Sequence, residues 1–393
     1  MNHTYDSAEG ILRKLVSFPV QGGQSNLPIA QWIQDYLENL GVSTHTFLNE
    51  DGDKMGLHAR IGPPVDGGII LSGHTDVVPV EGQSWDTDPF EMRDGGDGKL
   101  YGRGTCDMKG FLACCLYAVP DMIKANLKKP IYLAFSYDEE IGCQGAPALI
   151  EHMSQTYSEK PEFAIIGEPT MMQPVIGQKG ICVIRTTVNG SAGHSSRIRQ
   201  EVSAVHEAAR LVMWIENHMN KLVEERRLDD RFDPPHTSMH VGRIQGGIAA
   251  NVIADLATFD WDIRVIPGDS VHNILDKFRQ FCDTRQEELK TVFPDFNIET
   301  NLEHPPVPPL DTSPDSEILR LVQRLTGNES WSTVAYAAEA GQFSEAGYES
   351  IICGPGSIAQ AHRANEFIDK VQLQKCISLL QKLIAEVAGV GDH

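Results

Sequence analysis

The chain has 393 residues, of which 41% are hydrophobic and 22% charged, a balance typical of a globular protein and not of a disordered one. This length exceeds what one hydrophobic core usually covers, so we expect two domains. A formal net charge of −21 repels phosphate backbones, which argues against nucleic acid as a partner, and no apolar run approaches the roughly 18 residues that a membrane span needs.

The first part of the chain alternates helices with short apolar strands. Residues 28–40 place Ile29, Ile33 and Leu37 on one helical face. Further helices are expected at 109–118 and 146–153, and the apolar runs predict buried strands at 69–72, 131–135, 163–166 and 350–353. Strands that alternate with helices predict an α/β domain with a mostly parallel sheet.

The middle of the chain has a different order of elements. A strand is expected at 174–188, a helix at 202–225, strands at 236–244 and 256–265, a helix at 271–289 and a last strand near 296–300. This β-α-β-β-α-β order is the ferredoxin-like α+β plan. The α/β pattern resumes with a helix at 317–325. We therefore expect an α/β domain made of residues 1–176 and 301–393, with residues 177–300 inserted into it.

The cysteines and the first residues indicate the cellular compartment. None of the eight cysteines forms a CxxC pair, and the opening Met-Asn-His-Thr-Tyr-Asp lacks the basic and apolar regions of a signal peptide. We expect a reduced, cytoplasmic protein with buried thiols and no disulfide framework.

Histidines and carboxylates follow the predicted strands of the α/β domain at their C-terminal ends, which is where sites form in open α/β sheets. They are His74, Asp76, Asp107, Glu139, Glu140, Glu168 and His362. One such residue alone is usually a cap or a surface group. Several on successive elements are costly near apolar strands unless they are paired or bind a cation.

Imidazole nitrogens and carboxylate oxygens together form a ligand set that suits zinc, and also manganese or cobalt. Ligands this numerous are enough for two metals that share one carboxylate. Asp76 is placed to reach the second ring nitrogen of His74 and so to fix its tautomer. Adjacent Glu139 and Glu140 point in different directions on an extended chain, so one can bind metal while the other activates water.

Several motifs in the chain resemble those of the M20 metallopeptidase family, in the family's order and over nearly the whole length. They are Gly73-His-Thr-Asp-Val-Val-Pro79, Gly102-Arg-Gly-Thr-Cys-Asp-Met-Lys-Gly110, Asp138-Glu-Glu-Ile-Gly142, Gly167-Glu-Pro-Thr170 and Ala361-His-Arg-Ala-Asn-Glu-Phe367. The resemblance implies a hydrolase with two divalent metal ions, and an inserted domain that forms a homodimer and partly covers the active site.

The resemblance also assigns roles to individual residues. Glu139 would be the general base, and Asp76 would orient His74. One metal would bind to His74, Asp107 and Glu168, and the second to Asp107, Glu140 and His362, with Asp107 bridging the two ions.

Residues of the inserted domain match family positions that contact the substrate. His194, in Gly-His-Ser-Ser, would reach across the dimer and stabilise the oxyanion. Asn251 and Arg264 would bind the substrate α-carboxylate, for which arginine supplies a planar fork.

The likeness is greatest to the branch that removes the acetyl group from N2-acetyl-L-ornithine, in arginine biosynthesis. It rests on Thr105-Cys-Asp-Met-Lys-Gly-Phe111, Ala338-Glu-Ala-Gly-Gln-Phe343 and Gly354-Pro-Gly-Ser-Ile-Ala-Gln-Ala-His362. After His362, Arg-Ala-Asn-Glu replaces the expected Gln/Lys-x-Asp-Glu. The δ-ammonium of ornithine would pair with Glu339 or, alternatively, Glu345.

Other functions stay open at this point. The same catalytic residues serve a succinyl-diaminopimelate desuccinylase, a broad N-acyl-amino-acid aminoacylase, and a carboxypeptidase or dipeptidase. A metal-binding scaffold without turnover is a further alternative, but a pure binder has no need of the base Glu139. On every enzymatic interpretation the partner is a small amide substrate.

Overall fold

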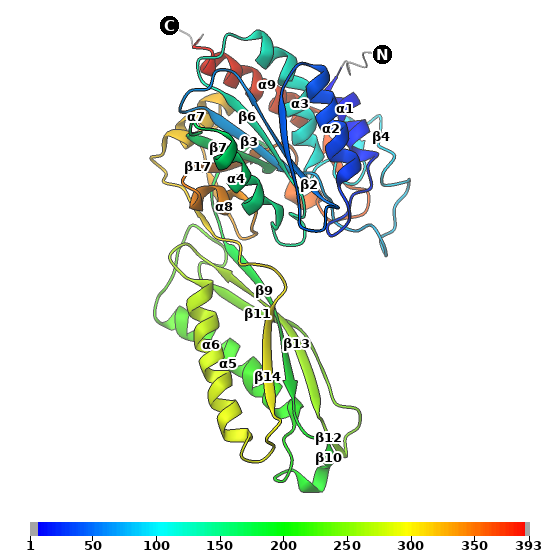
Figure 1. The fold of residues 1–393 in the computed structure, drawn as a ribbon, viewed down its shortest axis with the longest axis vertical. Helices are drawn as coiled ribbons and strands as arrows, with labels where there is room; N and C mark the ends of the chain where they lie inside the picture. Colours follow the sequence, from blue (N-terminus) through cyan, green and yellow to red (C-terminus); the bar gives the residue numbers. More distant parts are fainter. Residues whose placement is uncertain (1–6, 390–393) are drawn as a thin grey trace. The chain divides into compact units, whose positions relative to one another are not determined.

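The computed structural model describes residues 7–389, which divide into two compact units (Figure 1). The first, here called the α/β unit, contains the described residues up to Gly177 together with Leu310–Thr333 and those from Ala338 onward. The second, here called the inserted unit, contains Gln178–Pro309 and Val334–Ala337.

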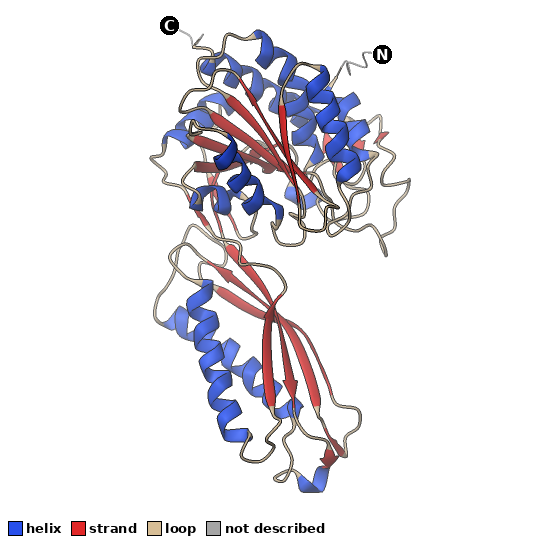
Figure 2. Ribbon diagram, in the orientation of Figure 1, coloured by secondary structure: helices blue, strands red, loops and turns tan. Residues whose placement is uncertain are grey.

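The α/β unit is built on a nine-stranded sheet with the order β1-β2-β6-β3-β7-β17-β8-β15, in which β16 also pairs with β8 (Figure 2). Its centre, β6-β3-β7-β17, is parallel, whereas β1 and β2 at one side and β8 at the other run antiparallel to their neighbours. The strands are β1 (Thr44–Leu48), β2 (Met55–Ile61), β3 (Ile69–His74), β6 (Ile131–Ser136), β7 (Phe163–Pro169), β8 (Val175–Gln178), β15 (Leu310–Asp311), β16 (Ser332–Val334) and β17 (Glu349–Gly354).

Helices cover this sheet. They are α1 (Ala8–Val16), α2 (Leu27–Asn39), α3 (Lys109–Lys124), α4 (Gly145–Thr156), α7 (Glu317–Thr326), α8 (Ala340–Glu345) and α9 (Lys370–Val387). The helices α1, α2, α3, α7 and α9 share one apolar core with Ile69 and Leu71 of β3, whereas α4 and α8 contact each other outside that core. Because side chains alternate along a strand, Ser72 and His74 point away from that core, toward the opposite face of the sheet.

Smaller elements complete the α/β unit. A three-stranded sheet has the order β18-β5-β4, and the short helix η2 precedes His362 in the chain. The bounds are β4 (Arg93–Asp94), β5 (Lys99–Tyr101), η2 (Ile358–Gln360) and β18 (Phe367–Asp369). No helix among residues 7–389 is both long and apolar enough to cross a membrane.

The inserted unit has the expected β-α-β-β-α-β order. Its four-stranded sheet, β11-β13-β9-β14, is antiparallel throughout. Trp261 and Phe278 lie in its separate apolar core. The elements are β9 (Gly180–Asn189), β10 (Gly193–His194), η1 (Ser195–Arg197), α5 (Ala204–Glu224), β11 (Ser238–Gly246), β12 (Val252–Ile253), β13 (Leu256–Val265), α6 (Val271–Leu289) and β14 (Asn297–Leu302).

The prediction of one strand at 174–188 is wrong, because this segment forms two strands, β8 and β9. Lys179 interrupts the strand, and its buried ammonium donates to the carbonyl oxygens of Pro234 and His236 at 2.7 and 2.8 Å. The inserted stretch also runs past residue 300 to Pro309, because Val307 pairs with Ile181.

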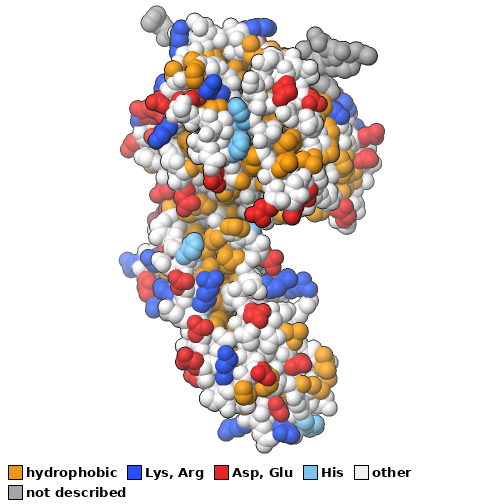
Figure 3. All heavy atoms as spheres, in the orientation of Figure 1, with side chains coloured by type: hydrophobic (Ala, Val, Ile, Leu, Met, Phe, Trp, Pro, Cys, Tyr) orange, Lys and Arg blue, Asp and Glu red, His pale blue; other side chains and the backbone are white. Residues whose placement is uncertain are grey.

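The negative charge of the chain is not concentrated on one visible patch. On the face drawn in Figure 3, Asp and Glu side chains are scattered over both units and interspersed with Lys and Arg. The net charge therefore gives no reason to assign a substrate to that surface.

Candidate metal centre

Neighbouring strands bring the predicted site residues of the α/β unit to one edge of the sheet. His74 ends β3 and pairs in register with Ser136, the last residue of β6. Glu139 and Glu140 lie three and four residues after the end of β6, and Glu168 lies in β7, the other neighbour of β3. The parallel order β6-β3-β7 therefore makes these side chains converge.

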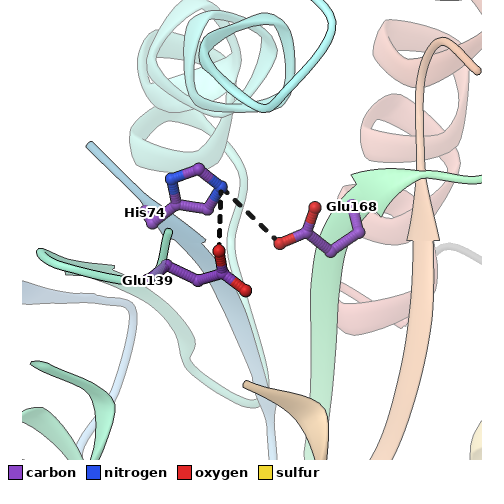
Figure 4. A group of neighbouring side chains, drawn as sticks. All are labelled: His74, Glu139 and Glu168. Atoms are coloured by element: carbon purple, nitrogen blue, oxygen red, sulfur yellow. Dashed lines mark ion pairs between the residues drawn. The ribbon is translucent and has the colours of Figure 1, made fainter. Parts of the chain in front are cut away.

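His74 lies at the centre of this group, and its ring is fully buried. Its Nε2 atom is 3.2 Å from Oδ1 of Asp107, 3.7 Å from Oε1 of Glu168 and 3.9 Å from Oε2 of Glu139. Figure 4 shows Glu139 and Glu168 pointing at this nitrogen from different elements. One ring nitrogen thus faces carboxylates from three separate segments.

Asp107 joins the two histidines. Its second oxygen, Oδ2, is 3.4 Å from Nε2 of His362, and the same nitrogen is 3.0 Å from Oε2 of Glu140. His362 comes from the loop after η2, and 55% of its side chain is exposed. Each oxygen of Asp107 therefore faces a different imidazole, which is the arrangement that a bridging ligand needs.

The hydrogen bonds of Asp76 differ from the expectation. Nδ1 of His74 is 2.9 Å from the main-chain oxygen of Asp76, and the carboxylate is farther, at 3.5 Å. A carbonyl oxygen can only accept, so Nδ1 carries a hydrogen and Nε2 is the nitrogen left to bind a cation. The carboxylate instead accepts the backbone N–H groups of Glu139 and Glu140 at 3.2 and 3.1 Å. Asp76 therefore orients His74 through its backbone and the Glu139–Glu140 turn through its side chain.

The electrostatics show that the cluster lacks positive charge. Burial, reinforced by the charge of Asp107, raises the pKa of Glu140 to about 7, and burial also raises the pKa of Glu168 and of Glu139. Hydrogen bonds to Asp107 and Glu140 raise the pKa of His362 to about 10. In each case the site favours added positive charge, whether from a proton or from a cation.

The donors of the cluster fit a divalent metal ion. Oε1 of Glu140 and Oε1 of Glu168 are buried and accept no hydrogen bond in the described structure. Ligand atoms of His74, Glu139 and Glu168 lie within 4.8 Å of one another, as do those of His74, Asp107 and Glu140. Unsatisfied carboxylate oxygens beside imidazole nitrogens are suitable ligands for zinc or a similar dication.

Sequence reasoning missed the residue that holds the Asp107 loop. Oε1 of Glu366 accepts the backbone N–H groups of Cys106 and Asp107 at 2.9 and 3.1 Å, and Oε2 accepts Nη1 of Arg103 at 2.8 Å. Glu366 is the glutamate of the motif that contains His362, so it ties the segment of Asp107 to the segment of His362. The motif was the available signal, but only its histidine was interpreted.

The inserted unit holds the predicted residues His194, Asn251 and Arg264. His194 is exposed on β10, and its Nδ1 is 2.8 Å from the hydroxyl of Ser196. The neighbouring Ser195 N–H donates to the main-chain oxygen of Asn251 at 3.0 Å, so His194 and Asn251 lie at one end of the unit.

Arg264 lies at the other end of β13, and its Nε is 3.3 Å from a carboxylate oxygen of Asp262. At about 3.3 Å per residue, the strand separates Arg264 from Leu256, beside the Asn251 end, by about 26 Å. Asn251 and Arg264 of one copy therefore cannot bind the same carboxylate group.

Glu339 and Glu345, the predicted partners of a substrate ammonium, have opposite environments. Glu345 is exposed at the end of α8. Glu339, just before α8, is only 1% exposed, and its carboxyl group accepts hydrogen bonds from the hydroxyls of Ser136 and Ser72. This enclosed position gives no support to direct contact between Glu339 and a substrate.

Comparison with known proteins places these features in a family. A model of peptidase family M20/M25/M40 matches residues 70–386. Acetylornithine deacetylase of Myxococcus xanthus is 33% identical over 394 residues, covering 99% of this chain and 100% of the relative. Acetylornithine deacetylase of Aliivibrio salmonicida is 34% identical over 356 residues, covering 91% and 89%.

Solved structures show the same fold. An M20 family metallo-carboxypeptidase from Sulfolobus solfataricus superposes with a TM-score of 0.75 at 17% identity, covering 98% of this chain and 99% of its own. A Bacillus subtilis protein described as a dinuclear metal-binding peptidase of the M20 family superposes with a TM-score of 0.63 at 14% identity, covering 97% and 98%.

Proposed function

The chain belongs to peptidase family M20/M25/M40, and from that premise we propose that it is a zinc-dependent hydrolase that removes the acetyl group from N2-acetyl-L-ornithine. The observation that supports this substrate is the likeness to acetylornithine deacetylases, at 33% and 34% identity over most of each chain. The products would be acetate and L-ornithine, and the reaction would belong to arginine biosynthesis in the cytoplasm.

Two dications are proposed for the metal centre. His74, Asp107 and Glu168 would hold one ion, and Asp107, Glu140 and His362 the other, with zinc preferred over cobalt or manganese. The unsatisfied oxygens of Glu140 and Glu168 support this assignment, as does the Nε2 of His74, which faces carboxylates while Nδ1 bonds to the main-chain oxygen of Asp76. When bound, such ions polarise a carbonyl oxygen and lower the pKa of water, which is the chemistry that amide hydrolysis requires.

Glu139 is proposed as the general base. Its carboxyl group points at the metal centre, and its backbone N–H is held by Asp76. Glu139 would take a proton from the attacking water and return it to the leaving α-amine, so that water adds across the C–N bond. Burial raises the pKa of Glu139, which suits a group that must hold the proton between these steps.

The substrate α-carboxylate is proposed to bind Arg264 and Asn251, and His194 to stabilise the oxyanion. Because Arg264 lies at the opposite end of β13 from the other residues, a second copy of the chain would have to supply Asn251 and His194. This separation supports a homodimer in which each site uses residues of both copies.

Mixing two inactive variants tests this arrangement. In a mixed dimer of His194→Ala with Glu139→Gln, one site would combine an intact base with an intact partner histidine. Random exchange of subunits should therefore restore about a quarter of the wild-type activity. Recovery of no activity by mixed dimers, with exchange verified by mass, would refute a shared site.

A substrate panel tests the proposed reaction. Zinc- and cobalt-loaded protein is assayed on N2-acetyl-L-ornithine, acetylmethionine, acetylnorvaline, N-succinyl-diaminopimelate and a dipeptide. The highest kcat/KM is expected for acetylornithine. Preference for the succinyl substrate would identify a desuccinylase, equal rates on the acetylated amino acids an aminoacylase, and release of an amino acid from the peptide a peptidase.

A substitution tests the base. Glu139→Gln should lower turnover by roughly 10²–10⁴-fold, the usual contribution of general acid–base catalysis, and leave the metal content unchanged. Glu151→Gln, at an exposed glutamate of α4, is the matched control and should keep full activity. Near-normal turnover of Glu139→Gln would show that another group is the base.

A further inference from the structure

Glu339 is a buried acid that the proposed reaction does not use. It lies just before α8 and is 1% exposed. The Ser136 hydroxyl donates to its Oε1, and the Ser72 hydroxyl donates to its Oε2 at 3.4 Å. Both serines are fully buried, so the carboxyl group bridges two hydroxyls in the interior of the α/β unit.

The two serines belong to the strands that present the metal centre. Ser72 lies two residues before His74 on β3, so the two side chains share one face of the sheet. Ser136 is the last residue of β6 and pairs in register with His74, and Glu139 and Glu140 follow three and four residues later. The Glu339 bridge therefore joins β3 to β6 next to the register pair of His74 and Ser136.

Burying this acid is costly for the fold. No ion pair joins Glu339 to a lysine, arginine or histidine among the described residues, and burial raises its pKa to about 7 although the nearby His74 acts to lower it. A buried carboxyl group that forms no ion pair destabilises a fold, and such costs are typically found where function requires them. The position of the bridge indicates what is gained, namely a fixed separation of the two strand ends.

We propose that Glu339 is a positioning residue that clamps β3 to β6 and so sets His74 against the Glu139–Glu140 turn. It acts through Ser72 and Ser136 and does not touch the substrate. The proposal rests on the proposed function in taking His74 as a metal ligand. It replaces the expected pairing of Glu339 with a substrate ammonium.

The test compares substitutions along the bridge. Glu339→Ala removes both contacts, Ser136→Ala removes one, and Glu339→Gln keeps the volume and can still bond to both hydroxyls. Affinity for Zn²⁺ is measured by competition with a chelator, together with kcat, KM and the melting temperature. Glu151→Ala, on the neighbouring helix α4, is the control at an exposed glutamate.

We expect Glu339→Ala to weaken Zn²⁺ binding by about 10–100-fold and to lower kcat by a similar factor, as for other groups that orient metal ligands. KM should change by less than about twofold, because the residue does not contact substrate. Ser136→Ala should act in the same direction, and Glu339→Gln should recover most of the metal affinity.

Other results would overturn the proposal. A lower melting temperature with unchanged Zn²⁺ affinity in Glu339→Ala and Ser136→Ala would leave only a structural role. A rise in KM for acetylornithine, without one for acetylnorvaline, would restore the ammonium-binding role. Because Zn²⁺ affinity is measured without turnover, failure of every substrate in the panel would refute the proposed function and still leave this proposal tested.

Discussion

His58 makes a testable prediction about how stability depends on pH. Its ring is buried on β2, with Nδ1 2.9 Å from the hydroxyl of Tyr157 and Nε2 2.7 Å from Nδ1 of His152. The ring of His45 stacks on it, with the centroids 5.3 Å apart. A proton added to His58 would thus enter a buried site that already faces two other imidazoles.

The pKa gives the size of the effect. Burial, and then the neighbouring His152 and His45, lower the pKa of His58 from 6.5 to about 3. Below pH 6.5 the unfolded chain therefore binds a proton on this residue that the folded chain does not bind. The free energy of unfolding thus decreases as the pH is lowered from about 6.5 to about 3. At about 1.4 kcal/mol per pH unit, the loss from this residue between pH 7.5 and 5.0 is about 2 kcal/mol.

Urea unfolding of wild type and His58→Gln at the two pH values measures this term. The variant has no ring to titrate, so its loss of stability between pH 7.5 and 5.0 should be about 2 kcal/mol smaller than that of wild type. His272→Gln, at an exposed histidine of α6, is the control and should behave as wild type. Equal losses in wild type and His58→Gln would refute the reasoning.

Two further substitutions address the supports of the metal centre. Asp76→Asn places an amide N–H₂ against one of the backbone donors of the Glu139–Glu140 turn, so turnover should fall by about 10–100-fold while measured metal content stays close to wild type. Glu366→Gln leaves the guanidinium of Arg103, which is 1% exposed, without its counterion and should cost about 3–5 kcal/mol in urea unfolding. By contrast, Glu162→Gln breaks an exposed pair with Lys129 and should cost no more than about 1 kcal/mol.

The sequence predicted the parallel centre of the sheet well because its strands are buried on both faces. Continuous apolar runs mark β3, β6, β7 and β17, and chemistry-bearing residues follow them at the ends. The flanking strand β1, Thr44–Leu48, is half-exposed and carries no such run, so it went unpredicted. The boundary within residues 174–188 was missed although Gly177 and Gly180 lie on either side of it, and in the structure a hydrogen bond of the Lys179 ammonium holds the chain between the two strands.

The burial of an individual side chain, unlike the length of a strand, could not be predicted from the sequence alone. Glu339 sits in an Ala-Glu-Ala-Gly segment that has no local sign of an interior position, and its carboxyl group is buried against Ser72 and Ser136 of strands distant in the sequence. The separation of Asn251 and Arg264, in contrast, was available in advance. An extended strand was already expected between them, and its length alone places them at opposite ends.

Asp76 couples the two halves of the proposed chemistry, and this coupling has a consequence for mutagenesis. Its backbone oxygen fixes the ring of His74, whereas its carboxylate holds the turn that carries Glu139 and Glu140. A side-chain substitution leaves the backbone contact in place, so the orientation of His74 should survive and the position of Glu139 should not. Asp76→Asn and Glu139→Gln both act on the carboxyl group of Glu139, one through its position and the other through its chemistry. Their effects on kcat should therefore be far from additive. If the double variant instead lost the product of the two single effects, Asp76 would act on the reaction independently of the base.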